Sequence, residues 1–347
     1  MEISKYLISE KCSVLECLQQ INQLRTDMNL FVVNEKNKLL GSVTDGDIRR
    51  GILKGIGLDE KVARVMNASC KHLVQRQIDL HLIIEQRNKF IKILPITNDE
   101  HEVVALLNFN QVKTLLPVDA VIMAGGTGSR LLPLTQKVPK PLLPVGGKPI
   151  IAYNLERLQK FGVKHITITV NYLKEQLVKF VEDLGENGRH MKCVTESKPL
   201  GTMGAVSLID QWHNDYILLT NSDLLTNVDY EDFFLEFLKS KASMMVATIP
   251  YPIQVPYAIL ETDGSTIKAF KEKPEYTYYA NTGIYLFKRE LISYIPKNKF
   301  FNATDFMDRL LIEGHKLSYY PMTGYWLDIG KHEDFKKAKE DIKHLKF

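Results

Sequence analysis

The feature that most constrains the fold of this chain is the stretch 119–145, in which an apolar run leads into glycines. Residues 120–124 are Ala-Val-Ile-Met-Ala, a pattern that predicts a buried strand. Gly125, Gly126 and Gly128 follow at once, and glycine permits backbone angles that other residues resist. Such a loop can close its amide N–H groups on a phosphate chain without side chains in the way. The stretch therefore predicts a strand followed by a phosphate-binding loop.

Two cations follow this glycine loop. Arg130 offers a fixed positive charge with a planar fork of donors. Lys140 stands between Pro139 and Pro141, whose rings restrict the backbone around it. An ordinary turn between a strand and a helix requires neither cation, so the pattern favours a site for a nucleoside triphosphate.

The loop does not fit the two common phosphate-binding patterns. A P-loop needs Lys and then Ser or Thr directly after its last glycine, whereas Ser129 and Arg130 follow Gly128. A dinucleotide fingerprint needs a further Gly or Ala at a fixed spacing, and that position is Leu131. A different kind of nucleotide site is therefore expected.

Over its full length the stretch resembles the signature of the sugar-1-phosphate nucleotidyltransferases, the enzymes that make nucleotide sugars. The agreement runs in order from the apolar strand through Arg130 to the segment around Lys140. The resemblance implies that both cations are catalytic and that the loop backbone binds the nucleotide. The nucleotide-binding residues implied in this loop are Ala124, Gly125, Gly126, Thr127 and Gly128.

A second loop of the same resemblance is 200–205, Leu-Gly-Thr-Met-Gly-Ala. In the family the backbone of this loop reads the base, and Gly201 permits a close approach. Glu196 stands at a position that the family often fills with Glu, and its role is left open here.

Two aspartates match the metal-binding positions of the family. Asp223 follows the apolar run 216–219, and Asp328 lies in the segment Trp-Leu-Asp-Ile-Gly. A single Asp at the end of a strand is more often the cap of a turn or helix. Two that match two family motifs imply a shared Mg²⁺ site, and Mg²⁺ commonly uses one or two carboxylates together with substrate phosphates.

The remaining motifs concern the sugar. The segment 270–274, Phe-Lys-Glu-Lys-Pro, resembles the family's Phe-x-Glu-Lys-Pro. This assigns the grip on the sugar phosphate to Lys273 and hydrogen bonds to sugar hydroxyls to Glu272, while Lys271 is interpreted as a surface lysine. Asn281 begins Asn-Thr-Gly-Ile-Tyr, whose Asn contacts the sugar in the family.

The implied reaction is attack by a sugar 1-phosphate oxygen on the α-phosphorus of a nucleoside triphosphate, with pyrophosphate leaving. A phosphate monoester is already an anionic nucleophile, so no general base is required. Catalysis then consists of positioning and charge neutralisation. We expect Arg130, Lys140, Lys273, Asp223 and Asp328 to converge on one cleft.

The first part of the chain, residues 1–116, reads as two copies of one unit. A shift of 64 positions places Asn34 on Asn98, Gly41 on Ala105 and Ile48 on Val112, and repetition of this kind is informative. Each copy is expected to contain a helix, two strands and a short second helix, which in the second copy begins at Asn110. The pattern resembles a tandem pair of CBS domains, modules that bind adenosyl compounds between two copies.

A Thr and an Asp three residues later contact the ribose in that family. Thr44 and Asp47 match these positions in the first copy, whereas the second copy has Asn108 and Gln111. The resemblance implies an adenine nucleotide as a regulatory ligand. The alternatives are that Thr44 and Asp47 cap the following helix, or that the pair serves only for dimerisation.

From position 118 to 347 strands and helices alternate, which argues for an α/β domain with a mainly parallel, Rossmann-like sheet and helices on both faces. Later β segments, at 244–249, 258–261, 267–272 and 281–287, are expected to lie over the edge of that sheet. The link around 114–118 is short, so two domains are expected, an α+β CBS pair over 1–116 and a nucleotidyltransferase domain over 118–347.

Charge and composition argue against several classes of protein. The net charge of +4 is small for 347 residues. The sequence also contains no basic cluster of the kind typical of nucleic-acid binding. No apolar run is long enough to span a bilayer, and the first residues lack a signal-peptide pattern. The four cysteines fit no zinc spacing. We expect a cytoplasmic protein without nucleic-acid or membrane partners that forms a homo-oligomer.

Proteins that combine these two domains resemble guanylyltransferases of bacterial surface-glycan pathways, including those that make GDP-glucosamine for legionaminic-acid-type sugars. The expected substrates are therefore GTP and glucosamine 1-phosphate or a related hexosamine 1-phosphate. UTP, dTTP or CTP with another sugar 1-phosphate is the alternative. A hypothesis of another class is an inactive nucleotide sensor that retains the fold.

Overall fold

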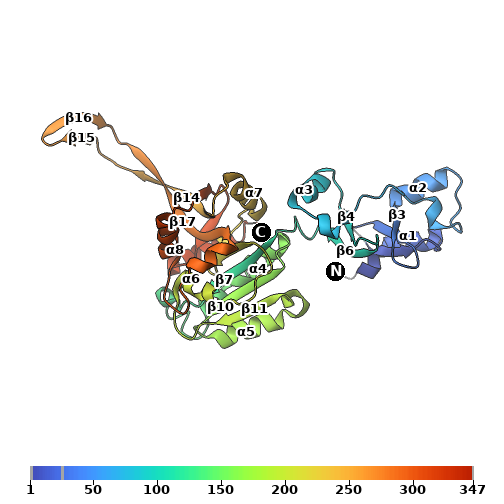
Figure 1. Cartoon of the computed structure of the whole chain (residues 1–347), viewed down its shortest axis with the longest axis horizontal. Helices are drawn as coiled ribbons and strands as arrows, with labels where there is room; N and C mark the ends of the chain where they lie inside the picture. The colour runs from blue at the N-terminus through green and yellow to red at the C-terminus, as the bar shows by residue number, and fades with distance from the viewer. Residues whose placement is uncertain (1–2, 25–26, 346–347) are drawn as a thin grey trace. The chain divides into compact units, whose positions relative to one another are not determined.

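The computed structural model describes residues 3–24 and 27–345. The chain forms two compact units, Met1–Leu115 and Leu116–Phe347 (Figure 1). Each unit is described by itself.

The first unit contains two three-stranded sheets with the same topology. In each sheet the middle strand pairs in parallel with the first strand and antiparallel with the third. The antiparallel pairs carry an irregularity at Val32/Val33 and at Ile96/Thr97, and these positions are related by the shift of 64. The elements are β1 (Leu7–Ser9), α1 (Val14–Gln23), β2 (Asn29–Val33), β3 (Leu39–Thr44), α2 (Asp45–Leu53), β4 (Leu73–Val74), α3 (Leu80–Asn88), β5 (Ile93–Thr97) and β6 (Val103–Asn108).

The two repeats are joined by reciprocal backbone hydrogen bonds. Leu39 N–H donates to the His101 carbonyl (2.9 Å), and Val103 N–H donates to the Asn37 carbonyl (3.0 Å). The shift of 64 relates Leu39 to Val103 and Asn37 to His101, so the two bonds are equivalent. The repeats therefore pack around a local pseudo-twofold axis.

The helix expected from Asn110 is a turn, which corrects the prediction for the end of the second repeat. The Asn110 N–H donates to the side-chain oxygen of Asn108 (2.9 Å). The Asn108 side-chain nitrogen donates to the Asp27 carboxylate (2.9 Å), which also accepts the Tyr6 hydroxyl (2.6 Å). Because the buried Asn108 side chain is committed to this turn and to Asp27, the chain does not begin a helix here.

The second unit is built on a seven-stranded sheet in the order β11-β10-β7-β12-β17-β14-β18. The first four strands in this order are parallel, and β17 is antiparallel to both of its neighbours. This is the mainly parallel sheet predicted. Its strands are β7 (Val118–Ala124), β10 (His165–Val170), β11 (Met191–Thr195), β12 (Tyr216–Asn221), β14 (Met244–Gln254), β17 (Glu275–Lys288) and β18 (Leu317–Pro321).

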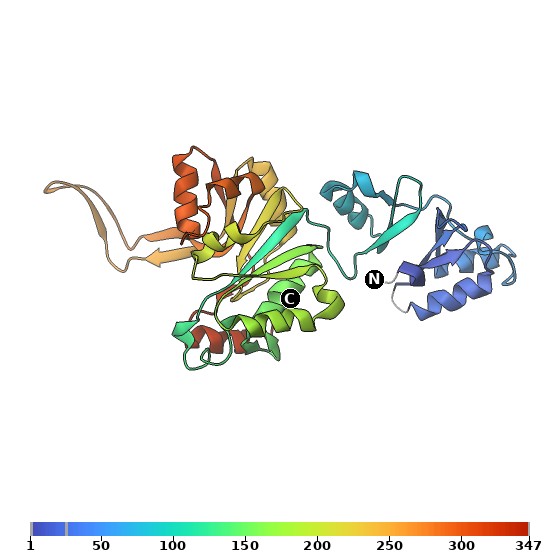
Figure 2. The same cartoon turned by 60° about the horizontal axis from the view of Figure 1, so that its bottom comes forward.

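Helices cover both faces of this sheet (Figure 2). One face packs on α8 (Ala303–Ile312) through a core that includes Val121, Leu219 and Phe287. The remaining helices of the unit are α4 (Ile150–Lys160), α5 (Lys174–Asp183), α6 (Gly201–Gly204), α7 (Tyr230–Ser240) and α9 (His332–Asp341). Burial of alternate strand residues on the two faces supplies the main stabilisation of the unit.

The prediction that the β segments at 244–249 and 281–287 lie over the sheet edge was wrong. Strands β14 and β17 lie inside the sheet, between β12 and β18. Residues 244–248 are all buried, and a continuous buried run of this kind is typical of an interior strand.

Beyond the sheet, β14 and β17 continue as a two-stranded ribbon that ends in the hairpin of β15 (Ile259–Asp263) and β16 (Thr266–Lys271). Figures 1 and 2 show this ribbon in light orange, projecting from the unit. We call residues 249–280 the arm. Its outer strands have exposed side chains on both faces.

Candidate functional site

A cleft opens at the carboxyl ends of β7 and β12, where ligands bind in open α/β sheets. Met123 and Ala124 come from the end of β7, and Asn221 ends β12. The glycine loop and the loop before α6 form its walls. The lining residues are Met123, Ala124, Gly125, Gly126, Gly128, Ser129, Arg130, Lys140, Pro141, Thr169, Glu196, Pro199, Leu200, Gly201, Thr202, Asn221, Ser222, Asp223, Phe300 and Asn302.

The glycine loop is shaped by close backbone packing. A Cβ at Gly125 would lie 2.4 Å from a Glu196 carboxylate oxygen, and one at Gly128 would lie 2.9 Å from the Thr135 methyl. Gly128 also has φ +61°, which favours glycine. The Thr135 hydroxyl donates to the Gly128 carbonyl (2.9 Å). At Gly126 a Cβ would meet nothing within 4 Å, so the loop presents open backbone to the cleft.

Glu196 links the two loops of the cleft. Its Oε2 accepts the Leu200 N–H (3.0 Å), while its Oε1 faces Gly125. Burial raises the pKa of the Glu196 carboxyl, and the Leu200 hydrogen bond opposes that rise. The role left open in the sequence is thus a support: Glu196 fixes the second loop against the first.

The second loop turns at Gly201, which has φ +74°. A Cβ there would lie 2.9 Å from the Phe301 carbonyl oxygen. The Phe301 N–H donates to the Leu200 carbonyl (2.8 Å), and the Met203 N–H donates to the Phe301 carbonyl (2.9 Å). Only glycine fits a position with both this φ and this neighbour.

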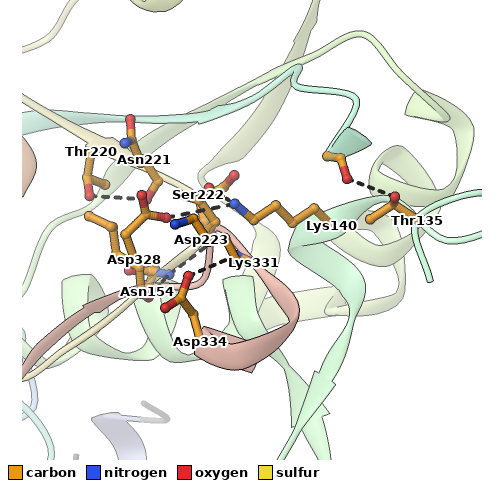
Figure 3. A network of polar contacts seen from close by, with 12 residues as sticks. Thr135, Lys140, Asn154, Thr220, Asn221, Ser222, Asp223, Asp328, Lys331 and Asp334 are labelled. Carbon is orange, nitrogen blue, oxygen red and sulfur yellow. Dashed lines mark hydrogen bonds and ion pairs between the residues drawn. The ribbon is translucent and has the colours of Figure 1, made fainter. Parts of the chain in front are cut away.

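Asp223 and Asp328 are brought together by a short strand pair (Figure 3). Strand β13 (Leu224–Thr226) pairs with β19 (Trp326–Asp328), and Leu224 lies opposite Asp328. Lys140 reaches both aspartates: its ammonium forms an ion pair with Asp223 and lies 3.8 Å from Asp328 Oδ1. The side chain of Lys140 is 10% exposed.

Opposing electrostatic effects act on the Asp328 carboxyl. Burial raises the pKa of the Asp328 carboxyl, the nearby Asp223 raises it further, and Lys140 and Arg130 oppose the rise. The Oδ1 atoms of Asp223 and Asp328 are both buried without a hydrogen-bond partner among the described residues. Two buried carboxylate oxygens that lack hydrogen bonds fit a divalent cation that takes its remaining ligands from phosphates and water.

Arg130 lies on the same side of the cleft. It stands in a 3₁₀ turn, Ser129–Leu131, directly after the glycine loop. Its guanidinium is about 3.5 Å from where a Cβ at Gly330 would lie, two residues beyond Asp328. Of the five residues expected to converge, the structure brings together Arg130, Lys140, Asp223 and Asp328.

Lys273 and Glu272 are not in this cleft, contrary to the expected convergence. They lie in the arm beyond β16, and no arm residue lines the cleft in the described part of the chain. The physical reason is that β14 and β17 stay paired from Thr248 and Asn281 outward to Gln254 and Glu275.

Asn281 stands where the arm leaves the sheet. Its side-chain nitrogen donates to the Tyr285 hydroxyl (3.0 Å), and its side-chain oxygen accepts the Gly283 N–H (2.9 Å). A Cβ at Gly283 would lie 2.4 Å from the side-chain nitrogen of Asn221, which lines the cleft. Asn281 is therefore close to the cleft mouth without lining it.

Phe300 and Asn302 are cleft residues that sequence reasoning missed. Asn302 is the N-cap of α8 and forms a capping box with Asp305. The Asn-x-x-Asp pattern ahead of an apolar helix was a signal for that cap. It gave no indication that the preceding loop packs on Gly201.

In the first unit, Thr44 and Asp47 form hydrogen bonds to each other. The Thr44 hydroxyl donates to Asp47 Oδ2 (2.6 Å), the Asp47 N–H donates back to that hydroxyl (3.3 Å), and Arg50 forms an ion pair with Asp47. This is the capping box of α2. At the equivalent position of the second repeat, Asn108 is 1% exposed and bound to Asp27.

Comparisons with known proteins bear on both units. The family described as nucleotidyl transferase matches residues 119–344, and the CBS domain family matches residues 4–54. The chain is 32% identical over 232 residues to a mannose-1-phosphate guanylyltransferase of Mycobacterium tuberculosis, covering 65% of this chain and 64% of the relative. It is 31% identical over 230 residues to the bifunctional protein GlmU of Methanocaldococcus jannaschii, covering 64% and 54%.

Among solved structures, HddC from Yersinia pseudotuberculosis, complexed with GMP-PN, superposes with a TM-score of 0.50 at 26% identity. The match covers 65% of this chain and 99% of HddC. The chain spans 64% of the length of the first of these curated relatives and 54% of the length of the second. Within residues 3–24 and 27–345, no helix has the length and apolar character needed to cross a membrane.

Proposed function

Because the chain belongs to the nucleotidyl transferase family, with a CBS domain ahead of it, we propose that it transfers a nucleoside monophosphate from a nucleoside triphosphate to a sugar 1-phosphate and releases pyrophosphate. One observation carries the proposal: Lys140, Asp223 and Asp328 meet beside an open glycine loop at the carboxyl end of a parallel sheet.

Each residue has a role that follows from its position. The backbone from Ala124 to Gly128, with Thr127 in the loop, cradles the triphosphate. Arg130 and Lys140 neutralise charge on the phosphates as the α-phosphorus is attacked. The second loop, anchored by Glu196, holds Gly201 against the base. No general base is needed, because the attacking phosphate oxygen is already anionic.

We propose that Asp223 and Asp328 hold Mg²⁺, since both present a buried oxygen without a hydrogen bond. When bound, Mg²⁺ supplies charge neutralisation to the phosphates. Lys140 then exchanges its ion pair with Asp223 for a phosphate oxygen. Asn281 and Glu272 are proposed to contact the sugar, and Lys273 the sugar phosphate.

GTP is the proposed nucleotide. The guanylyltransferase name of the mycobacterial relative and the guanine nucleotide analogue in the HddC structure support it. The proposed acceptor is glucosamine 1-phosphate or a related hexosamine 1-phosphate, for bacterial surface-glycan synthesis. This choice rests on the domain combination described from the sequence. UTP, dTTP or CTP with another sugar 1-phosphate is the alternative.

Pyrophosphate release tests the reaction and the substrates together. The full chain is mixed with Mg²⁺, one of four nucleoside triphosphates and one of a panel of hexose and hexosamine 1-phosphates. We expect release with GTP and a hexosamine 1-phosphate. Release with another pair corrects the substrates, and no release with any pair, together with retained nucleotide binding, identifies an inactive sensor.

For the first unit we propose that an adenine nucleotide binds near Thr44 and Asp47 and tunes the transferase. The family match over residues 4–54 supports this site. Binding would require the capping box to release the Thr44 hydroxyl, at a cost of about 1 kcal/mol. Calorimetry of the full chain with ATP, ADP and AMP tests it; absence of binding leaves the unit as an assembly element.

A further inference from the structure

An unusually large number of exposed apolar side chains lie in the arm. The unit's parallel core buries its large residues, but Tyr257 is 75% exposed and Phe270 is 69% exposed. Nine of the 23 large apolar side chains exposed in the described chain lie in the arm: Tyr251, Ile253, Tyr257, Leu260, Ile267, Phe270, Tyr276, Tyr278 and Tyr279. A concentration of this kind marks an interaction surface.

A two-stranded ribbon is also marginally stable in water by itself. Among the described residues, the strands of the arm pair with one another: Ile259 to Asp263 pair with Lys271 to Thr266, and Val255 N–H donates to the Pro274 carbonyl (3.0 Å). At the base of the arm the Tyr279 ring packs on Tyr319, with centroids 4.7 Å apart. Neither face of this hairpin packs on the rest of the described unit. A surface that covers it would therefore supply stabilisation that the ribbon lacks.

Two lysines of the arm form ion pairs, and Lys273 is flanked in the sequence by Glu272 and Glu275. Lys268 pairs with Asp263 (2.6 Å), and Lys271 pairs with Glu261 (2.7 Å). Among the described residues no ion pair is formed by Lys273. A nearly neutral aromatic ribbon suits a protein surface better than a nucleic acid or an anionic membrane.

The cleft, in turn, is short of positive charge. Its lining includes the cations Arg130 and Lys140 and the carboxylates Glu196 and Asp223, and Lys140 is already paired with Asp223. A nucleoside triphosphate and a sugar phosphate together bring several negative charges. A cation in addition to Arg130, Lys140 and the proposed Mg²⁺ would help to hold both anions in line.

Within the described part of the chain, the residues that line the cleft include none from the arm of the same chain. The pairing of β14 with β17 runs regularly from Thr248 and Asn281 to Gln254 and Glu275, and its one irregularity lies at Val246/Thr248 inside the sheet. We propose that the arm instead docks on the nucleotidyl transferase unit of a second copy of this chain and places Lys273 in that copy's cleft. This inference rests on the proposed function for the role of Lys273.

Exchange of arms between two copies is self-consistent. In a two-fold dimer each chain gives an arm and receives one, so both surfaces are covered. The arm contributes six aromatic side chains, each able to bury about 150–250 Å². Together they supply surface on the order of the ~800 Å² that each partner gives to a standard interface.

Complementation between two inactive variants tests the exchange. Lys140→Ala removes a cation from the cleft, and Lys273→Ala removes the cation from the arm. In a mixed dimer, the cleft of the Lys273→Ala chain is intact and receives an intact arm from its partner. Co-expression in equal amounts should restore about a quarter of wild-type pyrophosphate release, because half of the dimers are mixed and each has one complete cleft of two. Lys271→Ala is the matched control and should keep wild-type activity alone.

Failure of complementation in dimers shown to be mixed, by two different affinity tags, overturns the inference and assigns Lys273 to its own cleft. A wild-type chain that is active as a monomer does the same. If the wild type releases no pyrophosphate, the proposed function fails and a second measurement decides the exchange.

That measurement is cross-linking without an activity assay. The variant Tyr257→p-benzoylphenylalanine is prepared with ¹⁴N and with ¹⁵N, mixed after unfolding and refolding together, and irradiated. Cross-linked peptide pairs that join the arm to another segment of residues 118–347 should include mixed-isotope pairs. Pairs of a single isotope only would show that each arm packs on its own chain and would overturn the exchange.

Discussion

The cleft and the arm belong to one domain and carry motifs of one resemblance, yet they are built differently. In the cleft, Asp223 and Asp328 stand at the ends of paired strands, and Lys140 is held between them. In the arm, Lys273 is exposed in the segment between β16 and β17, and the outer hairpin beside it is exposed on both faces. A motif on core strands has its position fixed by packing, whereas a motif on a free ribbon has its position fixed by whatever the ribbon docks against.

Asp223→Asn should give the largest effect on the cleft side of this comparison. Loss of one carboxylate charge weakens the metal site and leaves Lys140 with only its longer, 3.8 Å ion pair to Asp328. We expect kcat to fall about 10³-fold, as for loss of a main electrostatic group. Steady-state pyrophosphate release over a Mg²⁺ titration measures it, with Asp308→Asn on the surface of α8 as the matched control. Near-normal turnover at ordinary Mg²⁺ would contradict the assignment.

Lys273→Ala should lower kcat about 10²-fold, although Lys273 lies outside the cleft. Lys271→Ala, two residues away, removes an exposed ion pair with Glu261 and should change kcat less than twofold. The same assay compares them, with circular dichroism to show that both variants fold. Equal effects of the two changes would mean that the arm contributes only bulk charge.

Much of the cleft could be predicted from the sequence, for a physical reason. Arg130, Lys140 and the glycine loop follow a buried strand, and parallel strands bring their carboxyl ends to one edge. Apolar strand patterns therefore located Asp223. The partner strand of Asp328 could not be read from a three-residue segment, and only the family motif joined the two aspartates.

The position of the arm could not be predicted from the sequence. Segments 258–261 and 267–272 were predicted as β structure, and strands β15 and β16 are present there. Nothing in a local pattern specifies whether a hairpin folds back or projects, because that choice depends on surfaces far away in the sequence. In the same way, the pairing of Asn108 with Asp27 across 81 residues replaced the helix expected at Asn110.

Alanine substitutions at two glycines of the cleft should affect different properties, one the stability of the fold and the other the binding of the nucleotide. Gly201→Ala introduces a Cβ at φ +74° and 2.9 Å from the Phe301 carbonyl oxygen, so the free energy of unfolding should fall by about 1–3 kcal/mol.

Gly126→Ala introduces a Cβ that meets nothing within 4 Å and should change the free energy of unfolding by less than about 0.5 kcal/mol. It should nevertheless raise KM for the nucleotide, because its methyl group enters the phosphate loop. Thermal unfolding and nucleotide titration distinguish the two variants. Equal loss of stability in both would show that the loop is strained at Gly126 as well.

The smallest effect concerns the stability cost of the metal site itself. Burial and the neighbouring Asp223 raise the pKa of Asp328 in the folded chain, so ionisation of Asp328 opposes folding. This cost is absent below the ordinary carboxylate pKa of about 3.9 and grows as pH rises through the raised value. Asp328→Asn should therefore lose activity yet unfold at a slightly higher temperature than wild type near neutral pH without Mg²⁺, and the gain should vanish at acid pH. Thermal unfolding at a series of pH values measures it, with Asp308→Asn showing no such trend. A gain that is largest at acid pH would reverse the sign and contradict the electrostatic account of the cleft.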